Sequence, residues 1–284
     1  EAALRSYASI TLGFASRVAG DLPLALRRFQ EALKESDRAD SSLVNLNARL
    51  NIGIVQYRMG RMTAAEEGFR SSLEVARERL WTRTLGAAFL RYGLALVLHE
   101  RNRLGEALAE LSQAIEYLEA SDAFGFLGMA LVERARTQFV LGKAGLAAAD
   151  LAQAREIAGR HSVERVAFRA DLLSARMAVL AGEISRAERF LEAAGKAFPG
   201  GRIQGRSART EKFEAYLAER IRMHLSRGES RDALRLAGSG FRGAVSAGRG
   251  RNAIEFLALQ SPAGAGIPDA GKAAAGLRRG LLLA

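Results

Sequence analysis

The sequence predicts an all-α protein, a right-handed superhelix built from about seven helix-turn-helix repeats. Three observations predict it. The composition is rich in strong helix formers, with only 4 Pro among 284 residues. Short breaks that contain Gly or Asn recur about every forty residues, and small side chains stand at fixed distances from each break. We name the first helix of each unit the A helix and the second the B helix.

The breaks separate amphipathic segments at intervals of 40 to 46 residues. Gly, and to a lesser degree Asn, adopts the left-handed backbone conformation that ends one helix and lets another begin at once. Each break is therefore expected to be the corner between an A helix and its B helix. The corners are Gly20-Asp21, Gly60-Arg61, Asn102-Arg103, Gly142-Lys143, Gly182-Glu183, Gly228-Glu229 and, less clearly, Pro268-Asp269.

Alanine stands five residues after every break, and a second apolar residue follows four residues later on the same helical face. The alanines are Ala25, Ala65, Ala107, Ala147, Ala187, Ala233 and Ala273. The residues that follow them are Phe29, Phe69, Leu111, Leu151, Leu191, Ala237 and Leu277. Twelve residues before the alanines lie Gly13, Gly53, Ala95, Ala135 and Ala175, whereas the last two units have Ile221 and Ser261. Small side chains at these places let paired helices approach closely.

These signals place seven units in a single array over 1–284. Expected A/B pairs are 2–19/22–36, 42–59/62–79, 83–100/104–119, 124–141/144–159, 163–181/184–196, 209–227/230–247 and 251–260/270–283. Residues 197–208, with Pro199 and three glycines, are expected to form a loop or hinge. Residues 261–271 are expected to interrupt the last A helix.

The pattern of small and large residues resembles the tetratricopeptide repeat (TPR), although the usual TPR period is about 34 residues. The segments 92–118, 211–237 and 248–260 are similar to the repeat domain of MalT-like, large ATP-binding LuxR-family transcriptional regulators. The most specific parts are the corner Glu100-Arg101-Asn102 and the Arg- and Asn-rich start of the seventh A helix. The resemblance implies an inducer-sensing module that lies between an ATPase and a LuxR-type helix-turn-helix domain. Because the chain has no phosphate-binding loop, no helix-turn-helix after Ala284 and a start already inside a helix, we expect the sensor module alone.

Composition and spacing argue against an enzyme and against a cofactor. The chain has no Cys, and His99, His161 and His224 are too far apart for a local metal site. No apolar run reaches the roughly 20 residues of a membrane span, and no signal peptide is evident. We therefore expect a cytoplasmic protein without catalytic residues, bound metal or contact with a membrane.

The A helices are expected to line a concave face that binds a ligand. The candidate ligand-binding residues on this face are Tyr7, Phe14, Asn47, Phe89, Tyr92, Met129, Arg136, Phe139, Arg169, Arg176 and Arg222. Aromatic rings and guanidinium groups suit a polar organic ligand, an anionic metabolite or a peptide that carries carboxylates. The alternative is that the aromatic residues form ordinary core between repeats and that the arginines are solvated.

Charge is concentrated in the C-terminal part. From Lys196 onward there are 16 basic and 7 acidic residues, a net charge of 16 − 7 = +9 out of +11 for the whole chain. Such a surface could attract phosphates without sequence specificity. The same charge would also be found on a solvated Arg-rich helix surface, and specific DNA binding by this segment is not expected.

The leading hypothesis is a sensor that binds a small inducer or a regulatory protein or peptide and passes the event to other domains of a regulator. The second hypothesis is a stand-alone scaffold whose groove holds a peptide or partner protein.

Overall fold

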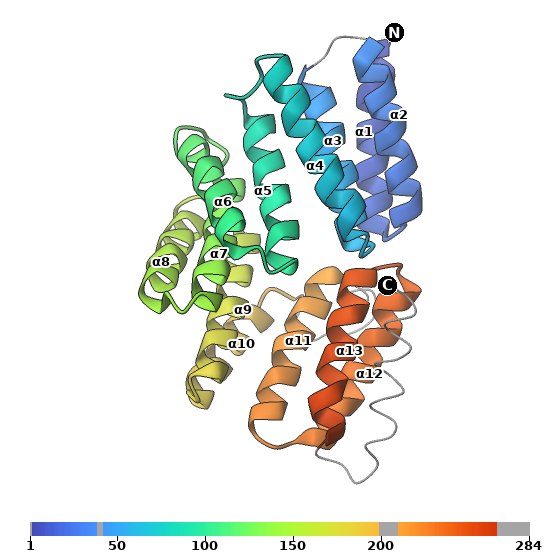
Figure 1. Cartoon of the computed structure of the whole chain (residues 1–284). Coiled ribbons are helices and arrows are strands. Elements are labelled where there is room, and N and C mark those ends of the chain that lie inside the picture. The colour runs from blue at the N-terminus through green and yellow to red at the C-terminus, as the bar shows by residue number, and fades with distance from the viewer. Residues whose placement is uncertain (1, 39–41, 199–209, 266–284) are drawn as a thin grey trace. The chain divides into compact units, whose positions relative to one another are not determined.

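The structure, a computed structural model, describes residues 2–38, 42–198 and 210–265. Within these ranges the chain forms helices and short turns and no β-strand, which confirms the all-α repeat prediction. Successive helices pack side by side as antiparallel pairs (Figure 1). The helices are α1 Ala2–Ala19, α2 Leu22–Arg38, α3 Ser42–Arg58, α4 Met62–Glu78, α5 Leu85–Glu100, α6 Leu104–Glu119, α7 Phe124–Val140, α8 Ala144–Arg160, α9 Glu164–Leu180, α10 Ile184–Gly195, α11 Glu211–Ser226, α12 Ser230–Ser246 and α13 Gly250–Ala265.

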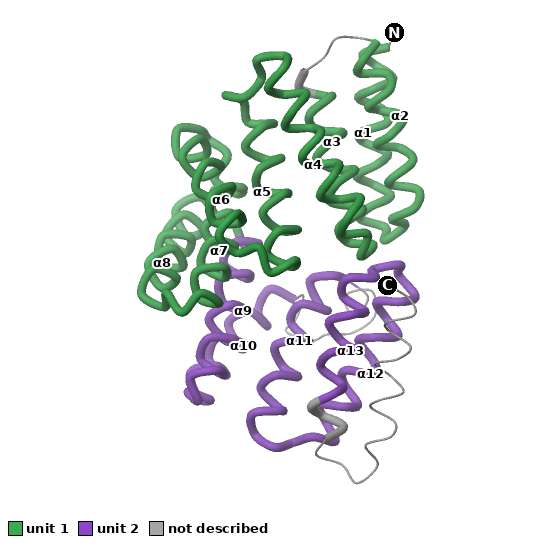
Figure 2. Tube along the Cα trace, in the orientation of Figure 1, with its two compact units in different colours: residues 1–163 green, residues 164–284 purple. Residues whose placement is uncertain are grey.

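The chain divides into two compact units (Figure 2). Unit 1 comprises residues 1–163 with helices α1 to α8, and unit 2 comprises residues 164–284 with helices α9 to α13. Within each unit, an A helix packs against the B helix that follows it and against the next A helix where these are described, as in α1, α2 and α3 or α9, α10 and α11. Each helix thus contacts near neighbours in sequence, which is the property that makes repeat proteins quasi-one-dimensional.

Six of the seven predicted corners lie in the described residues, and all six have the left-handed backbone that the sequence predicts. The φ angles are +88° at Gly20, +80° at Gly60, +58° at Asn102, +76° at Gly142 and +75° at both Gly182 and Gly228. In every corner the amide that follows this residue donates to a carbonyl five residues earlier. The bond from Arg61 to Gln56 is 2.9 Å long. This 6→1 bond satisfies a carbonyl that the helix end would otherwise leave unpaired.

The predicted small-residue contacts form the core of each repeat. All six described alanines that follow the corners are completely buried, from Ala25 to Ala233. In the second repeat Phe69 lies so close to Gly53 that a Cβ on this glycine would stand 2.5 Å from its Cε1 atom. Glycine is therefore required opposite phenylalanine, because any larger side chain would overlap the ring.

The two facing positions keep a complementary total size through the array. Gly faces Phe in the first two repeats, and Ala stands opposite Leu in the next three. The sixth repeat, which seemed to depart from the pattern, exchanges the two sizes. Its large residue is Ile221 on the A helix and its small one is Ala237 on the B helix, and both are fully buried in one cluster. Volume-conserving exchanges of this kind preserve packing.

The predicted helix ends are correct to within a few residues, with one clear error. The last A helix was expected to end at residue 260, but α13 continues to Ala265. Proline loses one backbone hydrogen bond within a helix, yet its fixed φ is close to the helical value, so the helix can continue through Pro262. Helices α5 and α11 begin at residues 85 and 211, later than predicted, because Thr84 and Thr210 cap them by accepting from the amides of Ala87 and Phe213.

The predicted loop or hinge at 197–208 lies outside the described residues except for Ala197 and Phe198. Phe198 is buried and packs edge-on against Phe168 of α9 and Tyr216 of α11, with ring centroids 5.9 and 5.5 Å apart. Lys212 of α11 donates to the carbonyl of Ala197 at 2.7 Å. The helices on either side of this segment therefore share one core. The expected B helix at 270–283 also lies outside the described residues.

Candidate functional site

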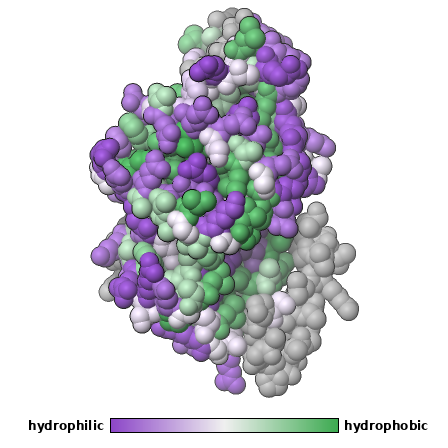
Figure 3. Space-filling model, turned by 60° about the vertical axis from the view of Figure 1, so that its left-hand side comes forward, coloured by the Kyte–Doolittle hydropathy of each residue, from purple (hydrophilic) through white to green (hydrophobic). Residues whose placement is uncertain are grey.

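All eleven candidate residues lie on A helices. Two are on α1, one on α3, two on α5, three on α7, two on α9 and one on α11. Except for Tyr7, which is half exposed, they are partly or largely buried. Each unit has an A-helix face, by which we mean the side of its A helices that carries these residues. Hydrophobic residues lie among hydrophilic ones on the face of the molecule seen in Figure 3, so neither kind dominates there.

The structure brings two of the aromatic candidates together with a third ring that the sequence reasoning missed. Phe89 of α5 stacks on Phe126 of α7 with ring centroids 3.8 Å apart, and Tyr92 meets the same ring edge-on at 6.1 Å. Phe89 and Phe126 remain partly exposed, whereas Tyr92 is buried. The three rings thus join neighbouring repeats and still offer an aromatic surface for an apolar or cationic group.

The remaining candidates of α1 and α3 do not join this cluster. Phe14 packs edge-on against Phe29 of its own repeat, and the guanidinium of Arg17 lies 5.3 Å from the centre of its ring. Asn47 accepts a 2.8 Å hydrogen bond from the side-chain amide of Asn51. These contacts stay within one helix or one helix pair, which is the ordinary structural role that the sequence analysis left open. Met129 and Phe139 are half-buried on α7.

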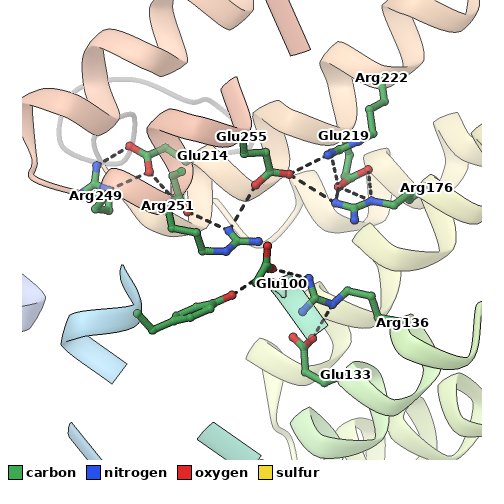
Figure 4. A network of polar contacts seen from close by, with 12 residues as sticks. Glu100, Glu133, Arg136, Arg176, Glu214, Glu219, Arg222, Arg249, Arg251 and Glu255 are labelled. Atoms are coloured by element: carbon green, nitrogen blue, oxygen red, sulfur yellow. Dashed lines mark hydrogen bonds and ion pairs between the residues drawn. The ribbon is translucent and has the colours of Figure 1, made fainter. Parts of the chain in front are cut away.

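Arg136 lies between two carboxylates of unit 1. Its Nη1 atom is 3.1 Å from Glu100 at the end of α5, and its Nε atom is 2.7 Å from Glu133 one turn earlier on α7. The hydroxyl of Tyr57 donates to the same Glu100 oxygen at 3.2 Å (Figure 4). A half-buried guanidinium held in this way is preoriented, which lowers the conformational entropy lost on binding a further anion.

Unit 2 carries a longer chain of alternating charges across α9, α11 and α13 (Figure 4). Arg176 binds the Glu219 carboxylate, with Nε 3.1 Å from Oε1. Arg222 donates to Glu219 at 2.9 Å and to Glu255 at 2.8 Å, and so joins the two carboxylates. Arg251 lies 3.3 Å from the other oxygen of Glu255. Two of the predicted arginines, Arg176 and Arg222, therefore belong to one network on the A-helix face.

The arginines of this network determine the ionisation of Glu255. Burial by itself would raise the pKa of its carboxyl, but the positive charges of Arg251, Arg222 and Arg176 outweigh burial and hold the pKa well below the usual range. Glu255 is therefore ionised at any physiological pH. Three arginines and two carboxylates therefore alternate in this network.

A second ion pair in unit 2 is buried more deeply. The Arg249 guanidinium binds both oxygens of Glu214 of α11, at 2.8 Å from Nε and 2.5 Å from Nη2. Asn252 of α13 adds a third hydrogen bond to this carboxylate at 2.7 Å. All three residues are less than a tenth exposed. This cluster fixes the corner between α12 and α13 to α11 and is not accessible for binding.

Within the described ranges, no three His, Cys, Asp or Glu side chains gather in a way that would hold a metal ion. His99 of α5 contacts the Thr137 hydroxyl of α7 at 2.9 Å, and this hydroxyl donates to the carbonyl of Glu133. The hydroxyl therefore accepts from Nδ1 of His99. The histidine joins two repeats. None of the helices in the described part is long and apolar enough to cross a membrane.

The carboxylate partners were missed, although the sequence contains a signal that identifies two of them. Glu-Arg-x-Arg occurs at 133–136 on α7 and again at 219–222 on α11, at equivalent positions of the repeat. In both copies the Glu and the second Arg stand one turn apart and form an ion pair. Phe126 has no comparable local signal, because its partners come from a different repeat. Glu255 has one local partner, Arg251 four residues earlier, and its other partners come from other repeats. The A-helix face can recognise carboxylates through arginine, and flat or apolar groups through its rings.

Comparison with known proteins gives a consistent fold. The family described as the MalT-like TPR region matches residues 1–284. Among solved structures, a Rap protein complexed with Competence and Sporulation Factor has a TM-score of 0.77 at 14% identity, covering 100% of this chain and 76% of that chain. NprR in complex with its cognate peptide NprX has a TM-score of 0.58 at 13% identity, covering 97% and 77%. The apo form of RapI has a TM-score of 0.52 at 13% identity, covering 98% and 85%. No curated protein matches this sequence.

Proposed function

Because the chain belongs to the MalT-like TPR family, we propose that it is the ligand-binding sensor domain of a bacterial LuxR-type transcriptional regulator, acting in the cytoplasm. The family match over residues 1–284 carries this proposal. The role is binding, not catalysis, and the ATPase and DNA-binding activities belong to other domains of the regulator. The structural similarity to Rap and NprR, at 13 to 14% identity, concerns the fold.

The ligand is a peptide or a small molecule that carries at least one carboxylate. Two structural neighbours of this chain are described with a bound peptide or factor, which favours a peptide. Arginines support the carboxylate in each unit taken by itself, since Arg136 of unit 1 and Arg176 and Arg222 of unit 2 are half-buried and preoriented by Glu side chains. The stacked rings of Phe89 and Phe126 suit an apolar group of the ligand.

Binding would signal through a population shift. A ligand that contacts several A helices favours the packing of neighbouring repeats in which these contacts are best, and its differential affinity determines how far the equilibrium moves. A coupling of about 1–3 kcal/mol between the ligand and the rest of the regulator is sufficient for a useful switch.

Thermal-shift screening of residues 1–284 against metabolites and short peptides tests the proposal. A ligand present at 100 times its Kd should stabilise the fold by about 2.7 kcal/mol. Arg176→Ala should then weaken binding at least tenfold, because a charge-assisted hydrogen bond contributes roughly 1.5–3 kcal/mol. Arg136→Ala should also weaken it. Arg186→Ala is the matched control, since Arg186 lies on a B helix, is mostly exposed and contacts its sequence neighbours Glu183 and Phe190. Unchanged affinity in both Arg176→Ala and Arg136→Ala would remove the A-helix face as the binding site.

The second candidate is a stand-alone TPR scaffold that binds a peptide or partner protein on the same face. The complex of NprR with its cognate peptide favours it equally well. The reading frame around this sequence separates the two candidates. Codons for a phosphate-binding loop upstream and for a helix-turn-helix downstream are expected for the regulator, whereas stop codons on both sides are expected for the scaffold.

A further inference from the structure

Glu255 of α13 receives guanidinium groups from three helices of unit 2 (Figure 4). Its carboxylate lies 2.8 Å from Nη2 of Arg222 on α11 and 3.7 Å from Nη2 of Arg176 on α9. Arg251, four residues earlier on α13, adds its Nη1 atom at 3.3 Å. The planar guanidinium group is well suited to bind carboxylates. Unit 2 therefore contains a formed carboxylate site, and the side chain that fills it belongs to the protein itself.

The two carboxylates of this network are held in different ways. Glu219 stands three residues before Arg222 on α11, its side chain is only 4% exposed, and Arg176 binds it through both Nε and Nη2. The side chain of Glu255 is 23% exposed, and Arg222 and Arg176 reach it from neighbouring helices. Glu219 thus orients the arginines from within the fold, whereas Glu255 borders the solvent and can turn away by rotation of its side chain.

Glu255 also stands at a repeat position that the sequence analysis assigned to ligand binding. It lies thirteen residues before the seventh predicted corner. The packing of α13 supports this register, because Phe256 lies against Gly240 of α12 as Ala48 of α3 shares a buried cluster with Ala32 of α2. The equivalent residues of the six preceding A helices are Tyr7, Asn47, Phe89, Met129, Arg169 and Ala215. The first five are candidate ligand-binding residues, and none of the six is acidic.

We propose that Glu255 is an internal substitute for the carboxylate of the ligand. In the free domain it occupies the site formed by Arg222 and Arg176, and a ligand binds there by displacing it. This inference rests on the proposed function, in which the A-helix face binds a carboxylate. It adds how the site of unit 2 is regulated: the affinity for the ligand depends on how firmly Glu255 holds the arginines.

The competition has a size that can be worked out. A charge-assisted hydrogen bond favours the paired state by a factor of about ten or more, so the arginine site is open for at most about a tenth of the time. The apparent affinity for a carboxylate ligand is lowered by the same factor. Because the arginines hold the pKa of Glu255 well below its usual range, this competitor stays charged at any physiological pH.

Displacement of Glu255 would change how α13 is held without detaching it. The buried hydrogen bonds from Arg249 and Asn252 to Glu214 of α11 do not involve Glu255 and remain. The ion pairs that Glu255 makes with α9 and α11 are lost. A ligand that binds to α9 and α11 is thereby sensed by α13, which gives the population shift two defined states.

A titration with succinate tests the proposal, because succinate offers carboxylates and no other functional group. Its Kd is measured from the NMR signals of the arginine Nε–H groups in residues 1–284, at constant ionic strength. Glu255→Gln removes the competing charge and keeps the size of the side chain. Glu183→Gln is the matched control, since it changes the net charge equally but affects an exposed pair with Arg186. Arg222→Ala removes one arginine of the site.

Glu255→Gln should bind succinate at least about tenfold more tightly than the natural protein, whereas Glu183→Gln should bind it as the natural protein does. Adding Arg222→Ala to Glu255→Gln should abolish the gain. Circular dichroism shows whether each variant is folded. If Glu255→Gln does not fold, Glu255→Asp replaces it. The shorter carboxylate keeps its charge but draws back from Arg222, so its Kd should be lower than that of the natural protein.

The same Kd for the natural protein and the folded variant at position 255 would overturn the proposal. If Arg222→Ala nevertheless weakens binding, the carboxylate site and the proposed function stand and only the displacement is wrong. Absence of succinate binding to Glu255→Gln would also overturn the proposal, because an emptied arginine site should accept a small carboxylate. The sensor function itself is tested separately, by the thermal-shift screen.

Discussion

The packing of Phe69 provides the sharpest test of how this repeat is built. Its ring lies between two glycines on adjacent A helices. A Cβ atom on Gly53 of α3 would be 2.5 Å from Cε1 of the ring, and one on Gly93 of α5 would be 2.4 Å from the same atom. Both distances are far below van der Waals contact, so the ring or the helices would have to move.

Gly53→Ala should therefore destabilise unit 1 in spite of the better helix propensity of alanine. Overpacking in a dense core costs about 1–3 kcal/mol. The gain from replacing glycine within a helix is about 1 kcal/mol. The net loss of unfolding free energy is then about 0–2 kcal/mol. Phe69→Leu alone should cost about 1–2 kcal/mol, because part of the space of the ring is left empty beside both glycines.

The double variant Gly53→Ala with Phe69→Leu recreates the pair that Ala95 and Leu111 form in the next repeat. We expect its loss to be smaller than the sum of the single losses by about 1–2 kcal/mol, the usual coupling between residues in contact. Urea denaturation followed by circular dichroism measures all four proteins. Gly105→Ala is the control, since a Cβ there would meet nothing within 4 Å and should not destabilise. Strictly additive losses would refute the idea that the two positions compensate each other in volume.

Two further predictions follow from the ion pairs. Glu214→Ala leaves the Arg249 guanidinium buried without its carboxylate and should lower the unfolding free energy by about 3–5 kcal/mol, while Asp232→Ala, which removes an exposed pair with Arg235, should hardly change the urea midpoint. Equal effects of the two would contradict the buried character of the first pair. For Glu66, burial alone would raise the pKa, but hydrogen bonds from Arg101, Arg70 and Arg103 lower it from 4.5 to about 2. A depressed carboxyl pKa contributes stability that is complete above pH 4.5 and is lost as the pH falls toward 2. Glu66→Gln should flatten this part of the curve of stability against pH, and an unchanged curve would show that other carboxyls dominate acid unfolding.

The exchange of sizes between Ile221 and Ala237 emerged only from the structure. The positions of the corners and of the buried alanines could be read from the sequence. Each depends on a steric requirement that recurs in every repeat. Gly60 and Asn102 mark corners because few residues adopt a positive φ, and Ala65 marks a helix crossing because a larger side chain does not fit. Because these requirements are local and recur in every repeat, the same residue types recur at fixed positions of the sequence. The fold class and most helix ends could therefore be predicted.

The carboxylate partners of the arginines and the exposure of Ala8 on α1 were decided by the tertiary structure. Arg222 and Glu255 are 33 residues apart, and Arg176 and Glu219 are 43 apart, so their pairing depends on how neighbouring A helices pack and rotate. The arginine content of the sequence is equally compatible with arginines that are solvated and unpaired with distant carboxylates. Ala8 and Ala48 are identical in type and in register, yet one is exposed and the other is fully buried. Whether a residue is buried depends on the helix that packs over it, and the residue type alone does not tell whether such a helix is present.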